Sequence, residues 1–132
     1  MKTMLMLSVM LCMLVASACQ PNNKPNDMKP EKLLRHVVIF KFKDSSSVAQ
    51  VKTVVDAFMG LKTKVPQVVD MEFGTNMSPE HFNEGFTHCF VLTYKSEKDL
   101  ADYQLHPAHK AFQEVLKPHM DKVFVVDYWV GE

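Results

Sequence analysis

Cysteine is scarce in this chain, and the lack of a pairable set excludes two common kinds of small protein. Only three cysteines occur among 132 residues, and Cys12 and Cys19 both lie in an N-terminal segment set apart by its composition. Cys89 is left without a partner, which excludes a disulfide framework and a cysteine-based zinc site in the remaining domain. Because Cys89 lies inside an apolar run, we interpret it as a small buried hydrophobe rather than a nucleophile.

The chain also lacks an excess of charge of either sign. One of its 15 basic residues, Lys2, belongs to the N-terminal segment, which leaves 14 against 15 acidic residues. No run or cluster of basic residues is present. Binding to nucleic acid depends on such positive charge, so we expect no nucleic-acid partner.

The first residues are typical of a secretory signal and are too short to span a bilayer comfortably. Met4 to Val15 form an apolar run of 12 residues after the positive Lys2, and small residues follow in "ASAC". A cysteine directly after small residues resembles the bacterial lipoprotein box, which implies a lipoprotein signal peptide over residues 1–18 and a lipid on Cys19. The alternative is an ordinary signal peptide cut near Ala18.

A polar stretch separates this signal from the rest of the chain. Residues 19–33 include "QPNNKPNDMKP", which is rich in proline and asparagine and typical of a flexible tether. We therefore expect a protein held at the bacterial cell envelope by its lipid anchor alone, on the periplasmic or the surface side. Residues 34–132 remain for one domain with a modest core.

Periodicity places six elements in this domain. "RHVVIFKFK" alternates along its length and is rich in β-branched and aromatic residues, which predicts a strand. Ser47 with Gln50, and Ser96 with Asp99, are capping signals for two helices. The predicted strands cover residues 35–43, 68–75, 86–95 and 122–130. The first helix runs from Ser47 up to Pro66, and the second is in two pieces, from Ser96 to a break at Pro107 and from there through Leu116.

This order, β-α-β-β-α-β, favours an α+β fold with one four-stranded antiparallel sheet and helices on one face, the ferredoxin-like arrangement. The other face then needs cover, because the last strand carries large apolar side chains on both sides. A second copy of the chain can supply that layer. The sequence therefore predicts a two-fold homodimer.

The segment Tyr103 to Phe112, "YQLHPAHKAF", concentrates the chemistry of the domain. The break at His106 and Pro107 places Tyr103 in the last turn of one helix and His109 in the first turn of the next. The positive end of the helix dipole favours the neutral imidazole, which suits a proton acceptor near neutral pH. The alternative is structural: His-Pro is a common stop-and-restart device, and the tyrosine can be half-buried packing.

Four motifs, "RHVVIFKFKD", "EGFTHCFVLTY", "YQLHPAHKAF" and "FVVDY", occur in an order and spacing that resemble the stress-responsive dimeric α+β barrel family (Dabb). The resemblance implies ferredoxin-like monomers that pair their sheets into a barrel, with this domain at residues 34–132. The sequence also resembles a plant polyketide cyclase of the family. That cyclase uses a tyrosine and a histidine as its acid/base pair, without metal or organic cofactor, and the resemblance implies that they match Tyr103 and His109. Two supporting histidines match His36 and His88.

The sequence differs from the cyclase in the first helix, where the aromatic pocket residues of the cyclase correspond to Val54 and Phe58. We therefore do not infer a polyketide substrate for this chain. We predict that a small apolar or aromatic ligand binds in a His/Tyr-lined pocket, with a cofactor-independent acid/base enzyme as the alternative. The predicted site consists of Tyr103 and His109 as the catalytic pair if the protein is an enzyme, and His36, His88, Val54, Phe58, Phe90 and His106 as ligand-binding residues.

The histidines also permit a metal-binding interpretation, which we do not favour. His36, His88, His106 and His109 are the candidate ligands, but no carboxylate stands at close ligand spacing to them. We therefore expect no metal and no cofactor. His81 and His119 are interpreted as surface residues, because one lies in a polar connection and the other beside Pro118 near a helix end.

Overall fold

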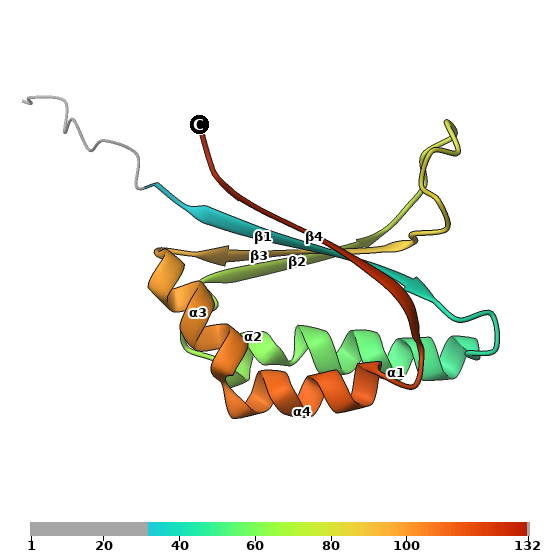
Figure 1. The fold of residues 1–132 in the computed structure, drawn as a ribbon, viewed down its shortest axis with the longest axis horizontal. Coiled ribbons are helices and arrows are strands. Elements are labelled where there is room, and N and C mark those ends of the chain that lie inside the picture. Colours follow the sequence, from blue (N-terminus) through green and yellow to red (C-terminus); the bar gives the residue numbers. More distant parts are fainter. Residues whose placement is uncertain (1–31, 132) are drawn as a thin grey trace, which may run out of the picture.

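The computed structural model describes residues 32–131 and contains one four-stranded sheet with four helical segments (Figure 1). The sheet order is β2-β3-β1-β4, and every neighbouring pair is antiparallel. This confirms the predicted ferredoxin-like fold. The elements are β1 (Leu34–Phe42), α1 (Val48–Met59), α2 (Leu61–Lys64), β2 (Asp70–Thr75), β3 (His88–Tyr94), α3 (Glu97–Leu105), α4 (Pro107–Leu116) and β4 (Met120–Trp129). The predicted signal, Cys19 and most of the tether lie outside the described residues.

Both predicted capping signals are present. The Ser47 hydroxyl accepts a hydrogen bond from the Gln50 backbone N–H at 3.2 Å, and the Gln50 side chain accepts one from the Ser47 N–H at 2.8 Å. The Ser96 hydroxyl accepts from the Asp99 N–H at 3.1 Å. These bonds satisfy amide groups that the first turn of a helix leaves unpaired. They explain why α1 and α3 begin where the sequence predicts.

All four strands begin one or two residues away from the predicted positions; β2, for example, begins at Asp70 instead of residue 68. β3 begins at His88 instead of residue 86, because the backbone N–H of Phe86 bonds the Asn83 carbonyl and closes a turn. β4 begins at Met120 instead of residue 122, since Met120 still pairs with Phe42 across a shift in register. Alternation of side chains alone reveals neither the turn bond nor the bulge.

All the helices lie on one side of the sheet (Figure 1). Side chains on that side of β1 alternate with those on the other side, and Leu34, His36, Val38 and Phe40 are buried. Phe40, Phe58, Phe90 and Phe112 pack with ring centroids 4.4 to 6.4 Å apart. This face, which we call the covered face, holds the hydrophobic core.

The opposite side of the sheet, which we call the open face, has no helix against it (Figure 1). Its central row runs Glu72, Val91, Val37 and Val126 across the four strands. Cys89 lies in the next row. It is half-buried, whereas we predicted a buried side chain, and this partial burial raises the pKa of its thiol. Within one chain, β4 is exposed on both of its faces, because it is the edge strand.

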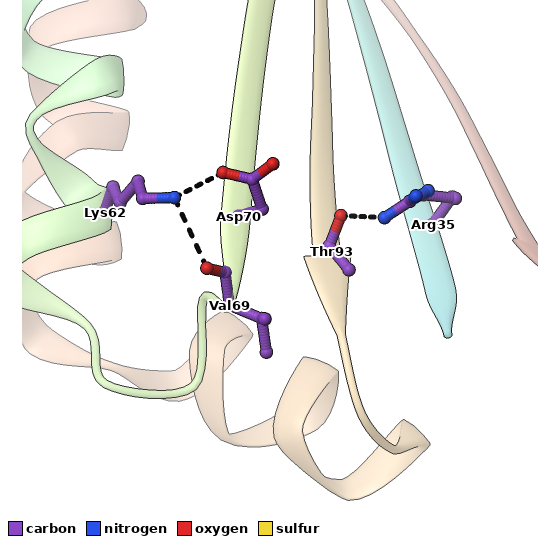
Figure 2. Close-up of polar contacts among 5 residues, drawn as sticks. All are labelled: Arg35, Lys62, Val69, Asp70 and Thr93. Carbon is purple, nitrogen blue, oxygen red and sulfur yellow. Dashed lines mark hydrogen bonds and ion pairs between the residues drawn. The ribbon is translucent and has the colours of Figure 1, made fainter. Parts of the chain in front are cut away.

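Polar contacts mark one end of the sheet (Figure 2). Lys62 of α2 reaches the Asp70 carboxylate and, at 3.3 Å, the Val69 carbonyl, and its hydrogen bond to Asp70 is the main reason that the pKa of Asp70 is lowered. Arg35 of β1 donates to the Thr93 hydroxyl of β3 on the open face. The first contact connects α2 to the edge strand β2, the second connects the central strands β1 and β3, and both lie at the end of the sheet where β1 begins.

Candidate functional site

The predicted break between two helices is present and places the central pair. His106 has an extended backbone, ends α3 and precedes Pro107, the first residue of α4. Its Nδ1 accepts a hydrogen bond from the Ala108 N–H at 3.1 Å. The imidazole therefore caps the N-terminus of α4, which is the structural role that we had weighed for the His-Pro pair.

Tyr103 and His109 lie against each other across this break. Their ring centroids are 4.3 Å apart and the planes are inclined by 32°. The Tyr103 ring is fully buried, whereas His109 is partly exposed. The Tyr103 hydroxyl has no hydrogen-bond partner among residues 32–131. A buried phenol O–H without a partner is costly, and it is a donor available to another molecule.

The hydrogen bonding of His109 assigns its tautomer. Nδ1 lies 3.2 Å from the Gln104 carbonyl oxygen, which can only accept, so Nδ1 carries the proton. In the neutral ring, Nε2 then presents a lone pair. Burial is the main cause that lowers the pKa of His109, opposed by the Gln104 hydrogen bond and assisted by nearby His36. The neutral form is favoured, as we predicted, and desolvation is its main cause.

His36 is held by a carboxylate that sequence reasoning missed. Its Nδ1 lies 2.6 Å from Oδ1 of Asp127, which stands directly opposite on β4. The carboxylate accepts, so Nδ1 is the donor and Nε2 of the neutral ring is left as an acceptor. A signal was available: Asp127 alternates with Val125 and Trp129 in the apolar half of its strand, where an acidic residue needs a partner.

A cavity of about 560 Å³ adjoins these groups on the covered face, between α4 and strands β1 and β4. His36, Tyr103 and His109 line its inner part, and four further polar or charged residues also line it: Gln104, Gln113, Glu114 and Lys117. Apolar side chains make up most of the remaining wall, and the chain brings them from β1, α1, α4 and β4. They are Val38, Phe40, Phe58, Phe112, Leu116, Met120, Val123 and Val125.

Of the predicted ligand-binding residues, only His36 and Phe58 line this cavity together with Tyr103 and His109. Val54 and Phe90 are fully buried in the core, and Phe90 packs on Phe58 with centroids 4.5 Å apart. They support the wall from behind. The prediction that these two residues line the pocket is therefore not met by this cavity.

His88 is also away from the cavity, and the reason is geometric. We expected both His36 and His88 to line the pocket, but β1 and β3 are antiparallel, so residues near the starts of these strands lie at opposite ends of the sheet. His88 pairs with Phe40, four residues along β1 from His36, or about 13 Å. Its ring packs edge-on against Phe42 at 4.9 Å, and burial lowers its pKa.

The other histidines do not gather into a metal site. Within residues 32–131, no three His, Cys, Asp or Glu side chains are placed to hold a metal ion. His81 is exposed, as predicted, in the connection between β2 and β3. His119 is half-buried rather than at the surface, with its Nδ1 3.1 Å from the Ser46 hydroxyl.

A second hollow of about 680 Å³ lies on the open face beneath the connection between β2 and β3. Ile39, Val91 and Phe124 form part of its floor. It contains no histidine or tyrosine, and it occupies the face that we expect a second copy to cover. The covered face is therefore the better candidate site.

No helix in the described part of the chain is both long and apolar enough to cross a membrane.

Comparisons with known proteins agree with this architecture. Residues 34–130 match the family described as the Stress responsive A/B Barrel Domain (Dabb). Olivetolic acid cyclase from Cannabis sativa is 30% identical over 95 residues, which cover 72% of this chain and 94% of the relative.

Solved structures give the same result for the fold. A hydroxynitrile lyase from Passiflora edulis superposes with a TM-score of 0.72 at 26% identity, covering 78% of this chain and 97% of that one. A dimeric protein of unknown function with a ferredoxin-like fold, from Bacteroides fragilis, superposes with a TM-score of 0.60 at 26% identity, covering 73% and 94%. Relatives of this chain thus include a cyclase and a lyase.

Proposed function

The chain belongs to the stress responsive A/B barrel (Dabb) family, and from this premise we propose that it binds a small apolar or aromatic molecule in the cavity of the covered face. The observation that carries the proposal is the buried Tyr103 hydroxyl, without a partner among the described residues, beside His109 at the wall of that cavity. An unpaired donor at the edge of an apolar hollow provides one oriented hydrogen bond within a mainly hydrophobic contact.

Size and composition of the cavity support this function. Its volume of about 560 Å³ falls within the roughly 300–1,000 Å³ of small-molecule sites, which are mainly apolar with a few placed polar groups. Phe58 and Phe112 stack face to face in its wall, with centroids 4.4 Å apart. Such a wall suits a flat ring or a short alkyl chain.

Acetophenone and isopropylbenzene are suitable probes, because both are aromatic and of similar shape. We expect His109→Ala to weaken binding of a simple phenol, whose O–H can donate to Nε2 of the neutral ring, by about 1–3 kcal/mol, the typical effect of removing a partner from a buried polar contact. Lys110→Ala, at the next position of α4 and outside the cavity wall, is the matched control and should bind as the parent does. Equal affinity in both variants would remove His109 from the site.

Acid/base catalysis is a second candidate function, because the tautomer of His109 and the character of the relatives both favour it. Nε2 of a neutral His109 has a lone pair suited to accept a proton from a carbon beside a carbonyl, while Tyr103 donates to the oxygen that becomes negative. The relatives named a cyclase and a lyase support such chemistry. It requires no metal and no organic cofactor.

Turnover separates the two functions. If His109 is a general base, His109→Ala should lower kcat by about 10²–10⁴ with little change in ligand affinity. The substrates to screen are β-ketoacyl and phenolic compounds without added cofactor. Conversion that disappears in both Tyr103→Phe and His109→Ala would establish the enzyme, and its absence would leave binding as the function.

We propose further that the chain forms a homodimer through its open face. Val126 is 39% exposed and Phe124 51% exposed on that face, and contiguous apolar surface of this kind marks an interaction site. The Bacteroides fragilis neighbour, described as dimeric at 26% identity, supports the same assembly. No nucleic acid is expected as a partner.

The proposed location is the bacterial cell envelope, with a lipid on Cys19 as the only membrane attachment. The proposal depends on "ASAC" and the apolar run before it. Replacing Cys19 by Ala should move the protein from the membrane to the soluble fraction. A variant that stays with the membrane would require a different anchor.

A further inference from the structure

A second tyrosine, the last residue of the motif "EGFTHCFVLTY", lies behind His36 and Tyr103 and does not itself line the cavity. Tyr94 is the last residue of β3, its ring is fully buried, and it faces α3 on the covered side. The rings of Tyr94, Tyr103 and His36 form a triangle. Their centroids are 5.5 Å apart for the two tyrosines, 5.9 Å for Tyr103 and His36, and 6.3 Å for Tyr94 and His36.

The polar atoms of this triangle are incompletely used. The hydroxyls of Tyr94 and Tyr103 are both buried, and neither has a hydrogen-bond partner within residues 32–131. Nδ1 of His36 gives its proton to Asp127, so Nε2 is left as an acceptor in the neutral ring. Buried hydroxyls nearly always have a partner. Two orphan donors on neighbouring buried rings therefore indicate that another molecule completes their hydrogen bonding.

We propose that Tyr94 is a specificity-determining residue, whose hydroxyl joins that of Tyr103 in hydrogen-bonding one oxygen atom at the inner end of the ligand. This inference rests on the proposed binding function. It names the class of ligand: an aromatic or alkyl body in the apolar cavity, ending in a carbonyl or phenolic oxygen. Hydrocarbons of the same size would leave both hydroxyls unpaired and bind more weakly.

The charge around the triangle selects a neutral oxygen over a carboxylate. Burial raises the pKa of both tyrosines, so they stay protonated donors. Proximity of Tyr103 and of the Asp127 carboxylate raises the pKa of Tyr94 further. The same negative charge repels an anionic ligand group at this point. We therefore expect ketones and phenols to bind better than benzoate-like acids.

The test compares acetophenone with isopropylbenzene, which differ mainly in the carbonyl oxygen, by titration of the purified protein monitored by NMR. The parent should bind acetophenone about tenfold more tightly, and Tyr94→Phe should remove most of that preference while leaving isopropylbenzene unchanged. Tyr128→Phe makes the same chemical change on the open face, where the ring is exposed, and should keep the full preference.

Other outcomes are equally decisive. If the parent binds both probes equally, an internal water or nothing occupies the triangle, and the inference is overturned while the proposed binding function stands. Failure of both probes to bind would overturn the binding function, and this inference with it. The melting temperature of Tyr94→Phe without ligand should be unchanged or higher, because an unpaired hydroxyl is removed. A fall of several degrees would show that the hydroxyl is bonded within the fold, against our inference.

Discussion

The covered face and the open face of the sheet both carry large apolar side chains, yet they are buried to very different extents within one chain. On the central strand β1, Val38 of the covered face is 5% exposed, whereas the neighbouring Val37 of the open face is only half-buried. The covered face obtains its burial from α1, α3 and α4 (Figure 1). The open face has apolar residues suited to burial that a single chain does not supply.

The candidate site lies beside the edge strand β4, where the helices stop covering the sheet. Val125 faces the helices but is 46% exposed, and it lines the cavity together with Val123. The core closes over β1 and β3, while a hollow remains beside β4, the edge strand. A cavity at the margin of a well-packed core has rigid walls on one side and an entrance on the other, which suits a binding site.

The largest expected effect concerns the open face. Val126→Lys places a charge in the middle of the proposed dimer interface, and burying it without a partner is unfavourable enough to separate the copies. Val115→Lys on α4 is the matched control, because Val115 is 38% exposed against 39% for Val126. Sedimentation should give a monomer for the first variant and a dimer for the second. If both variants are dimers, or both are monomers, the open face is not the dimer interface.

Phe58 tests the covered face. Its ring is 1% exposed and stacks on Phe112 at 4.4 Å, so Phe58→Ala should reduce the unfolding free energy by about 3–5 kcal/mol. Phe82→Ala is the control, since that ring is 84% exposed, and it should change stability by less than about 0.5 kcal/mol. Urea denaturation provides both numbers. Similar losses in the two variants would mean that the core is elsewhere.

His106 tests where the site ends. As an N-cap, its replacement by Ala should cost about 1 kcal/mol of stability, and its replacement by Asn should cost little, because Asn caps helices well. Both variants should bind acetophenone normally. If His106→Asn is as stable as the parent but binds weakly, then His106 contacts the ligand as the sequence predicted.

His109 should produce the smallest effect, a dependence of stability on pH. Its pKa is lowered from the ordinary value of 6.5, mainly by burial, so below about pH 6.5 the unfolded chain binds a proton before the folded one does. Stability should therefore fall as the pH drops from this value toward the lowered pKa, and then level off. In His109→Asn this part of the slope should be absent. An unchanged slope would mean that His109 is not desolvated.

The fold was predictable because its signals are local. The alternation of "RHVVIFKFK", the two capping serines and the His-Pro break each depend on neighbours in sequence, and the element order then selects the ferredoxin-like arrangement. The site was predictable only in part. Tyr103 and His109 are six residues apart in one motif, and the break between their helices brings the rings together.

The errors came from contacts between distant segments. His88 was misplaced because the direction of neighbouring strands decides which strand starts meet. Asp127 was overlooked because its pairing with His36 depends on the register of β1 against β4. Tyr94 carried no signal in sequence, since only the packed structure shows that its hydroxyl has no partner among the described residues.

The central claim is that the covered face, and not the open face, holds the ligand site. The most direct measurement is an NMR titration of the isotope-labelled protein with acetophenone, followed residue by residue. We predict that the resonances of Tyr103, His109 and Phe112 shift together with one dissociation constant. Shifts confined to Ile39, Val91 and Phe124, beneath the connection between β2 and β3, would place the site on the open face and contradict the account.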